Sequence, residues 1–420
     1  MAEGMVNKRV LMIAYHYPPL QGSSGIQRTL KFSQYLPEFG WHPIVLGAHP
    51  RAFQSTSTAQ MDEIPDEVIV HRAFALDTSR HLAIFGRYPL ALALPDRWVS
   101  WVLGAVPAGL RLIRKHRPEV IWSTYPIASA HLIGLILHRL TGIPWVADFR
   151  DSMTEDAYPP DPTVRKVYRW LERQTIRHCT RAVFTTPSAV RMYRERYPEI
   201  PGDRFCEIPN GYDEENFANV ESRQVSETLS PKPFVLLHSG IIYPSERDPR
   251  QFFAALAELA HAGKITSDKL QVVLRATQHD AYLAQLIQEF GIGHLVQLQP
   301  PIPYHDALSE MLAVDGLLIL QASNCNHQIP AKIYEYFRAQ RPILALTDPE
   351  GDTATTLGRV GVATIAPLDS KQAIIAGLTR FLEMLEQGNA PLAHKAQVLA
   401  CSRRSRTEAL AQLLDEVRNF

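Results

Sequence analysis

The chain has 420 residues, enough for two or three domains that each bury a core. Lysine plus arginine equals aspartate plus glutamate, 43 of each, and this balance argues against a nucleic-acid-binding protein. The four cysteines are scattered without a CxxC or Cys/His cluster, which argues against a structural zinc site and is typical of reduced, cytosolic thiols. No apolar run reaches the roughly 18 residues of a membrane span, and we expect a soluble protein without a signal peptide.

Strands alternate with helices through the first half of the chain. An apolar run at residues 10–14, of the kind that is buried on both faces of a parallel sheet, leads through a glycine-containing loop into a helix at 26–36. The same periodicities predict strands at 43–48, 68–73, 120–125, 145–151, 181–186 and 205–209 and a helix at 128–140. This order indicates parallel βαβ units joined by right-handed crossovers.

Polar residues follow two of these strands. Gly22 and Gly25 lie between the first strand and its helix, where backbone N–H groups could bind an anion. The GxGxxG fingerprint is absent there, and a plain strand-to-helix turn is the simpler alternative. Asp148, Arg150 and Asp151 end an otherwise apolar strand, at the position where open α/β sheets bind ligands. An arginine bridged by its acidic neighbours would explain the same residues, and both interpretations stay open.

A polar stretch at residues 219–233, which lacks periodicity and ends in prolines, is the clearest linker in the sequence. After it the alternation begins again. The expected elements are strands at 234–240, 270–275, 295–298, 316–320, 342–346 and 362–365 and helices at 250–262, 372–386 and 391–417. The chain thus consists of two α/β halves in tandem.

The stretch that begins at Asn326 carries the most chemistry of the second half. A polar loop runs into a short helix, with Pro330 expected in its first turn. A lysine in that turn, Lys332, is unfavourable for the helix dipole unless it holds an anion, and the free N–H groups of a helix start bind phosphate readily. Glu335 shares its face one turn further on, a spacing that suits a nucleoside diphosphate with its ribose. The alternative is a plain exposed ion pair between Lys332 and Glu335.

Five motifs, in order along the chain, carry a resemblance to a known family. They read YHYPPLQGSSGIQRTLKFSQYLPEFGW, GIPWVADFRD, IPNGYDEENF, HSGIIYPSERDPRQFF and IPAKIYEYFRAQRPILAL. In these motifs the chain resembles, nearly from end to end, the GT-B retaining glycosyltransferases of family four. The resemblance implies an α/β fold of two Rossmann-like parallel-sheet domains facing a central cleft, with the nucleotide sugar on the second domain and the acceptor on the first.

The resemblance also sets the expected domains. Residues 1–220 would form the N-terminal Rossmann-like domain on the acceptor side, 221–233 the linker, and 234–390 the C-terminal nucleotide-sugar-binding domain. Because the family's final helix commonly crosses back onto the first domain, we expect residues 391–420 to pack there.

Several residues match positions that have roles in the family. Glu335 matches the carboxylate that binds both ribose hydroxyls, and each hydrogen bond to an ionised carboxylate contributes roughly 1.5–3 kcal/mol. Arg247 and Lys332 fall where family members place cations on the diphosphate, with Gly240 in the tight turn beside them. Gly25 belongs to the glycine loop that faces the phosphates. The acceptor side would be lined by Asp148, Arg150 and Asp151.

The chain departs from the family pattern at one position. Family members often carry two glutamates eight residues apart, the earlier one near the transferred sugar, but His327 stands eight residues before Glu335. His327 could take that place beside the sugar, or it could be a surface histidine.

The reaction implied is transfer of a sugar, of the hexosyltransferase type, from a nucleoside-diphosphate sugar to an acceptor hydroxyl with retention at the anomeric carbon. Arg247, Lys332 and the helix N-terminus would stabilise the charge that develops on the leaving phosphate. No Asp-x-Asp occurs in the sequence, so we expect a metal-independent reaction without a cofactor. Family members often use a front-face route in which the leaving phosphate helps to deprotonate the acceptor, and we name no protein nucleophile.

The acceptor expected from the family is a glycan or a lipid-linked glycan of cell-envelope or exopolysaccharide biosynthesis. The segment at 82–117, rich in Leu, Trp and Ile with a basic end, could rest on an anionic membrane surface. A core-facing helical insert explains this segment equally well. We therefore expect a cytoplasmic protein, with a peripheral contact to the inner face of the membrane as an open alternative.

Three other classes of protein remain to be compared with a transferase. A GT-B sugar-nucleotide epimerase would share the nucleotide site but need no acceptor. A non-catalytic scaffold would keep the fold and lose the charge cluster, whereas Arg247, Lys332 and Glu335 are all present. A nicotinamide oxidoreductase would need the missing GxGxxG fingerprint.

Overall fold

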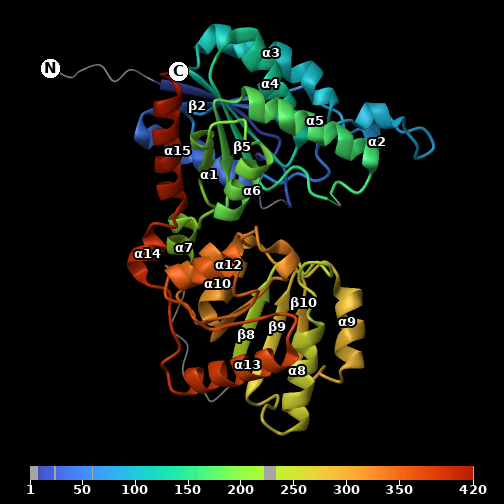
Figure 1. The fold of residues 1–420 in the computed structure, drawn as a ribbon, viewed down its shortest axis with the longest axis vertical. Helices are drawn as coiled ribbons and strands as arrows, with labels where there is room; N and C mark the ends of the chain where they lie inside the picture. Colours follow the sequence, from blue (N-terminus) through green and yellow to red (C-terminus); the bar gives the residue numbers. More distant parts are fainter. Residues whose placement is uncertain (1–7, 23–24, 59, 157, 222–232, 420) are drawn as a thin grey trace, which may run out of the picture. The chain divides into compact units, whose positions relative to one another are not determined.

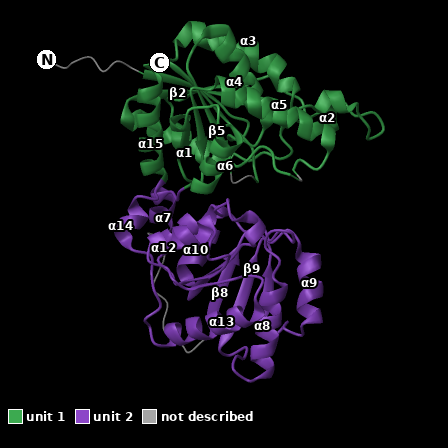
Figure 2. Ribbon diagram, in the orientation of Figure 1, with its two compact units in different colours: residues 1–210, 403–420 green, residues 211–402 purple. Residues whose placement is uncertain are grey.

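The computed structural model describes residues 8–22, 25–58, 60–156, 158–221 and 233–419. The chain divides into two compact units, one of residues 1–210 and 403–420 and the other of residues 211–402 (Figure 2). Each unit is built around its own parallel sheet (Figure 1). The two sheets with their covering helices confirm the α/β, Rossmann-like fold class predicted from the sequence.

The sheet of the first unit has seven parallel strands in the order β3-β2-β1-β4-β5-β6-β7. Its strands are β1 (Lys8–Ile13), β2 (Trp41–Ala48), β3 (Ile69–Ala73), β4 (Val120–Thr124), β5 (Trp145–Arg150), β6 (Arg181–Phe184) and β7 (Phe205–Glu207). Its α-helices are α1 (Gly25–Tyr35), α2 (Thr78–His81), α3 (Ser100–His116), α4 (Ala128–Thr141), α5 (Pro162–His178), α6 (Pro187–Arg196) and α15 (Arg403–Val417). Short 3-10 turns complete it, namely η1 (Leu36–Phe39), η2 (Pro50–Ala52), η3 (Leu90–Ala93) and η4 (Gly202–Arg204).

The central strands of this sheet are apolar because helices cover both of their faces. In β1 the side chains of Val10 to Ile13 have no exposed surface, and the tryptophans Trp122 of β4 and Trp145 of β5 are also fully buried. Helices α3, α4 and α5 pack in sequence against one another, while α15 packs on α1. The apolar runs read from the sequence therefore form a single continuous core.

The sheet of the second unit has six parallel strands in the order β10-β9-β8-β11-β12-β13. These are β8 (Phe234–Ser239), β9 (Leu270–Arg275), β10 (Val296–Gln299), β11 (Gly316–Leu320), β12 (Ile343–Leu346) and β13 (Ile365–Ala366). The helices are α7 (Glu214–Glu221), α8 (Arg250–His261), α9 (Asp280–Glu289), α10 (Tyr304–Ala313), α11 (Lys332–Ala339), α12 (Asp352–Arg359), α13 (Lys371–Glu386) and α14 (Lys395–Leu399), with one 3-10 turn, η5 (Ser323–Cys325).

Strand order locates the expected ligand positions in both units. The chain reverses its direction of travel across the sheet between β1 and β4 in the first unit and between β8 and β11 in the second. In open α/β sheets ligands bind at such a switch point, beyond the carboxyl ends of the strands. The loops that follow these four strands are therefore the first places to look for a site.

The unit boundaries differ from the expected domains at two places. Helix α7, expected in the N-terminal domain, belongs to the second unit, where Arg338 of α11 bonds to Glu214 at 2.6 Å and to Glu221 at 2.8 Å. The single helix expected at 391–417 is two helices, of which α14 belongs to the second unit and α15 to the first. The expected linker at 221–233 lies almost wholly outside the described residues.

The segment at 82–117 has two parts with different surroundings. Helix α3 buries Trp101, Ala105 and Leu112 and packs on β2, β3 and α4, as expected of a core-facing insert. The loop that follows α2 instead projects from the first unit (Figure 1), with Ile84 73% exposed and Phe85 fully exposed. Among the described residues, no helix is both long and apolar enough to cross a membrane.

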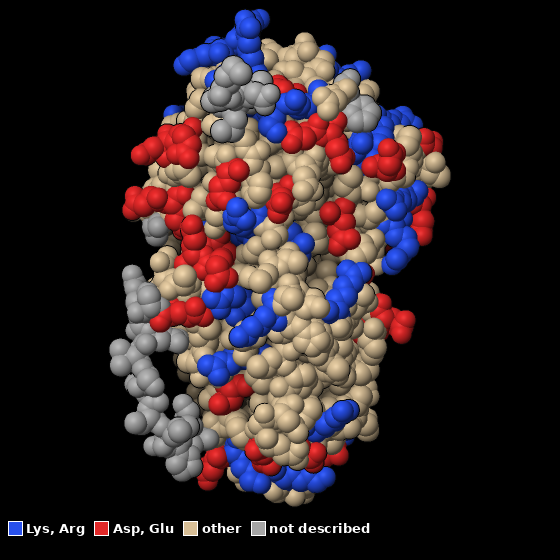
Figure 3. Space-filling model, turned by 90° about the vertical axis from the view of Figure 1, so that its left-hand side faces the viewer, with Lys and Arg blue, Asp and Glu red and all other residues tan. Residues whose placement is uncertain are grey.

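Acidic and basic side chains are interspersed over the surface. Figure 3 shows both kinds distributed along the face turned toward the viewer. This distribution agrees with the equal numbers of acidic and basic residues in the sequence.

Candidate active site

The switch point of the second sheet brings together three of the predicted site residues. Strand β8 ends at Ser239, and Gly240 follows with φ of 111°, a conformation that favours glycine. A Cβ atom at Gly240 would lie 3.0 Å from Nζ of Lys332, the first residue of α11. Arg247, in the loop that leads to α8, is close enough to lower the pKa of Lys332. Gly240, Lys332 and Arg247 thus surround one point at the carboxyl edge of the sheet.

A histidine that the sequence reasoning missed holds Lys332 in place. His238 of β8 has Nδ1 3.0 Å from the carbonyl oxygen of Leu318, which can only accept, so Nδ1 donates that bond. Nε2 of the neutral ring is then the acceptor for Nζ of Lys332, 3.0 Å away. Burial, followed by the nearby charges of Lys332 and Arg247, lowers the pKa of His238 well below its usual value. His238 therefore stays neutral and orients the lysine.

Lys332 lies in surroundings that disfavour its charge. Burial is the main cause that lowers its pKa well below the ordinary value, and Arg247 lowers it further, while Glu335 acts in the opposite direction. Arg247 donates a 2.6 Å hydrogen bond to the carbonyl oxygen of Ile241 and lies over the ring of Tyr243 at 5.5 Å. Two cationic groups held side by side in this way favour the binding of an anion.

Helix α11 places the carboxylate of Glu335 one turn beyond Lys332. Its buried face includes Ile333 and Phe337, which fixes the side on which the two charged residues lie. Tyr304, the first residue of α10, donates a 2.7 Å hydrogen bond to Oε1 of Glu335. The carboxylate is thereby oriented before any ligand binds.

The loop before α11 differs in detail from the expectation. Pro330 was predicted in the first helical turn, but α11 begins two residues later at Lys332. His327 lies half-buried in this loop, and its role beside a sugar stays a prediction. Gln321, at the end of β11, donates hydrogen bonds to the carbonyl oxygens of Cys325 at 3.0 Å and Gln328 at 3.2 Å, which fixes the path of the loop.

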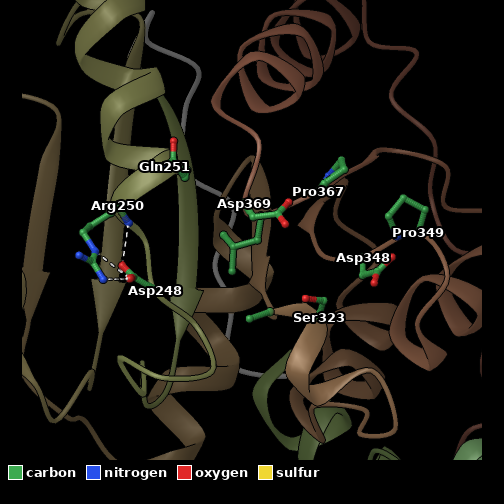
Figure 4. A pocket seen from close by; sticks show the side chains of 10 residues that line it. Asp248, Arg250, Gln251, Ser323, Asp348, Pro349, Pro367 and Asp369 are labelled. Atoms are coloured by element: carbon green, nitrogen blue, oxygen red, sulfur yellow. Dashed lines mark hydrogen bonds and ion pairs between the residues drawn. The ribbon is translucent and has the colours of Figure 1, made fainter.

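A cavity of about 470 Å³ opens at the same edge of the second sheet (Figure 4). It is lined by residues of the loops after β8, β11, β12 and β13, together with the first turn of α8. Asp248 and Arg250 pair with each other at 2.5 Å on one wall, and Asp369 lies on the opposite side (Figure 4). Arg247, Lys332 and Glu335 do not line this cavity.

In the first unit Asp148 does not line a ligand site. Its side chain has no exposed surface, and its two oxygens accept hydrogen bonds from Nη2 and Nε of Arg28 at 2.8 and 2.9 Å. Thr124 donates a further bond of 2.9 Å to the same carboxylate. Arg28 also bonds to the carbonyl oxygens of Ile208 and Pro209. The expectation that Asp148 contacts the acceptor is therefore corrected, because both oxygens of the carboxylate are bound within the first unit by Arg28.

Gly25 and Arg150 do lie together at the carboxyl edge of the first sheet. A Cβ atom at Gly25 would lie 2.7 Å from Nη1 of Arg150 and 2.5 Å from Nδ1 of His16, so glycine is needed for this close approach. Asp151 follows Arg150 and raises its pKa, although burial lowers that pKa more. His16, which follows β1, was not singled out from the sequence.

Among the residues that the structure describes, no group of three or more His, Cys, Asp or Glu side chains has the arrangement of a metal site. The candidate site of the second unit is instead defined by two cations and one carboxylate. Its groups match the chemistry of a diphosphate joined to a ribose.

Comparison with known proteins finds one matching family model and many similar folds. Residues 25–211 match the model of the glycosyl transferase 4-like domain. This match covers less than half of the chain, and together with the two parallel sheets it supports the GT-B glycosyltransferase class that the sequence motifs predicted. No curated protein sequence matches the chain.

Three solved structures illustrate the likeness in fold. Sucrose-phosphate synthase from Thermosynechococcus elongatus has 14% identity and a TM-score of 0.64, with 98% of each chain covered. HepE from Anabaena, in complex with UDP-glucose, also has 14% identity and a TM-score of 0.64, covering 97% of this chain and 99% of that one. An α,α-trehalose-phosphate synthase from Burkholderia xenovorans has 12% identity and a TM-score of 0.65, covering 97% and 100%.

The residues that sequence reasoning missed share one property. His238 lies 94 residues from Lys332, and Arg28 lies 120 residues from Asp148. The only local signal was a polar residue inside an otherwise apolar element, as with His238 at the end of its strand. Such a polar residue can be noticed in the sequence, but the sequence does not show which distant residue it contacts.

Proposed function

We propose that this protein transfers a sugar from a nucleoside-diphosphate sugar to an acceptor hydroxyl, with retention at the anomeric carbon and without a metal ion. The observation that carries the proposal is the cluster of Arg247, Lys332 and Glu335 at the switch point of the second sheet. Glu335 would bind the ribose hydroxyls, and the two cations would bind the diphosphate. HepE, whose fold is similar, binds UDP-glucose, which supports this class of donor.

Catalysis in this proposal is electrostatic. Cleavage of the bond between sugar and diphosphate leaves negative charge on the departing oxygen, and in this proposal Arg247 and Lys332 stabilise that charge. His238 keeps Lys332 aimed at that point without adding charge, since its own pKa is lowered. Two protein cations at the diphosphate, with no Asp-x-Asp in the sequence, support metal independence.

The test is transfer of labelled sugar with and without excess EDTA, with the anomeric configuration of the product read by NMR. We expect unchanged turnover in EDTA and a product with the configuration of the donor. Loss of turnover that added Mg²⁺ restores would contradict metal independence, and an inverted product would contradict retention.

For the acceptor we propose a glycan or a lipid-linked glycan of the cell envelope, reached by a cytoplasmic protein at the membrane surface. The exposed turn at Ile84 and Phe85 favours this location. From residue 78 to residue 95 the sequence carries Arg80, His81 and Arg87 and no acidic residue, a composition that suits an anionic lipid surface.

An epimerase acting on the nucleotide sugar would use the same cations and carboxylate. Incubation of donor without acceptor separates the two functions. An epimerase converts the sugar under these conditions, whereas a transferase leaves it unchanged apart from slow hydrolysis.

A further inference from the structure

Arg150 has an unusual backbone that the fold fixes independently of its side chain. It is the last residue of β5, next to a register shift between β5 and β6, and its φ is 61°, in the left-handed region. Its carbonyl oxygen accepts hydrogen bonds from the N–H of Thr185 at 3.1 Å and from Oγ1 of Thr185 at 2.9 Å. This conformation costs free energy for a residue other than glycine, and such residues cluster at functional sites.

The guanidinium of Arg150 lies close to the first residue of α1. Nη1 lies 3.4 Å from the carbonyl oxygen of Tyr125 and close against Gly25. Nε is buried and has no hydrogen-bond partner among the described residues. Within the same residues Arg150 forms no direct ion pair, although Asp151 and Asp148 act on it as nearby charges.

The surrounding charges offset the burial of this guanidinium only in part. Burial lowers the pKa of Arg150 more than Asp151 and Asp148 raise it, and Arg28 and Arg403 lower it further. Both oxygens of Asp148 are already bound by Arg28. His16 adds no charge, since burial and Arg150 lower its pKa to about 3. A buried cation whose neighbours do not offset its desolvation is stabilised by an anionic ligand.

We propose that Arg150 is the receptor for a phosphate group of a substrate that binds at the carboxyl edge of the first sheet. The proposal rests on the proposed transferase function and deepens it, because it makes one substrate of this unit a phosphate ester or diphosphate. The planar guanidinium suits a bidentate contact with phosphate oxygens, which a neutral glycan would not provide. Gly25 leaves the space in which the guanidinium lies.

Two substrates could supply the phosphate, and the experiment distinguishes them. Binding to the full-length protein is measured by calorimetry with inorganic phosphate and glucose 6-phosphate for the acceptor, and with UDP and GDP for the donor. The variants are Arg150→Met, Arg150→Lys and, as a matched control, Arg169→Met at an exposed arginine of α5. All are repeated with Glu335→Ala, which removes the ribose contact of the second unit.

We expect wild type and Arg169→Met to bind a phosphate probe, and Arg150→Met to bind it at least about tenfold more weakly. Arg150→Lys should retain part of the affinity for phosphate, because lysine keeps the positive charge. It should not retain all of it, because lysine lacks the planar guanidinium that makes a bidentate contact. If glucose 6-phosphate binding depends on Arg150 in the Glu335→Ala background, the acceptor supplies the phosphate group. Dependence of nucleotide binding alone identifies the donor.

The stability of Arg150→Met is a second measurement. If Arg150 had only a structural role, the variant would be less stable than wild type. In phosphate-free buffer Arg150→Met should be as stable as wild type or more stable, since a charge whose burial the neighbouring carboxylates do not fully offset has been removed. A less stable Arg150→Met, or a phosphate affinity that no Arg150 variant changes, overturns the proposal. The proposed transferase function would survive that result if Glu335→Ala still abolishes donor binding.

Discussion

The ammonium of Lys332 lies among a histidine, an arginine and a carboxylate, and each acts differently on its charge. His238 accepts its hydrogen bond at 3.0 Å and stays neutral. Arg247 lowers the pKa of Lys332 and Glu335 raises it, but burial outweighs both. An anion bound between Lys332 and Arg247 would raise the pKa of Lys332 again, so donor binding and protonation should be linked.

This linkage predicts a pH dependence of donor binding. The folded pKa of Lys332 is lowered in the free protein, so above that pKa the lysine must take up a proton when the diphosphate binds. Affinity should therefore fall as pH rises through the window between the lowered pKa and the pKa of the complex. Calorimetry of a nucleotide sugar in buffers of different ionisation enthalpy should show uptake of up to about one proton per ligand in that window.

Lys332→Met serves as the variant for this prediction, with Lys264→Met, at an exposed lysine after α8, as its control. The Met variant should bind the donor more weakly and without proton uptake. Equal proton uptake in wild type and Lys332→Met would show that another group titrates.

The limits of sequence reasoning are clearest at single residues. The pairing of Lys332 and Glu335 on one helical face followed from their spacing, and the structure places both at the carboxyl edge of the second sheet. The role of Asp148 could not be predicted, because Arg28 reaches it across 120 residues. The sequence pattern of a charged residue at the end of a strand is the same whether its side chain contacts a ligand or an internal partner.

At the scale of elements, apolar periodicity located every strand of both sheets to within about three residues. It failed where tertiary surroundings decide the structure. The helix expected at 391–417 breaks at residues 400–402, where the chain passes from one unit to the other and the carbonyl oxygen of Cys401 accepts a hydrogen bond from the N–H of Tyr212. The segment at 82–117 likewise divides into a packed helix and an exposed loop, which hydrophobicity alone does not separate.

The exposed loop after α2 is the element that bears on membrane contact. Ile84 and Arg87 exchange backbone hydrogen bonds of 2.8 and 3.0 Å, and this closed turn presents Phe85 at φ of 52°. Two large apolar side chains are thus held in solvent, in a stretch of sequence that also carries Arg80 and Arg87. Insertion of this turn into a lipid interface would bury both side chains, each contributing about 1.5–3 kcal/mol.

We predict that the protein floats with vesicles of phosphatidylglycerol and phosphatidylcholine, and less so with phosphatidylcholine alone or at high salt. The double variant Ile84→Ser, Phe85→Ser should lose at least about 100-fold in partitioning. Leu140→Ser, at a leucine that is 61% exposed at the end of α4, is the control and should float like wild type. If the wild-type protein stays at the bottom of the gradient, the predicted membrane contact is wrong.

In the whole molecule we expect the two units to have different tasks. The second unit carries the carboxylate and cations that suit a nucleotide sugar, and the first unit carries Arg150, whose burial its neighbouring charges offset only in part. Both sites follow from the same rule, since each lies at the switch point or beyond the carboxyl end of a central strand. The fold could be predicted from the sequence because the apolar runs and their alternation with helices are local patterns. The identities of base, sugar and acceptor depend instead on side chains brought together from distant parts of the chain.

Thermal unfolding can show whether Glu335 binds the ribose of a nucleotide donor. Wild type, Glu335→Ala and the control Glu289→Ala, at an exposed glutamate of α9, are compared with UDP, GDP, ADP, TDP and their sugar conjugates. A ligand at about 100 times its Kd should add roughly 2.7 kcal/mol of stability. The account predicts a clear shift with one base in wild type and Glu289→Ala, and its loss in Glu335→Ala. A folded protein that responds to no nucleotide, or a Glu335→Ala variant that responds like wild type, would contradict it.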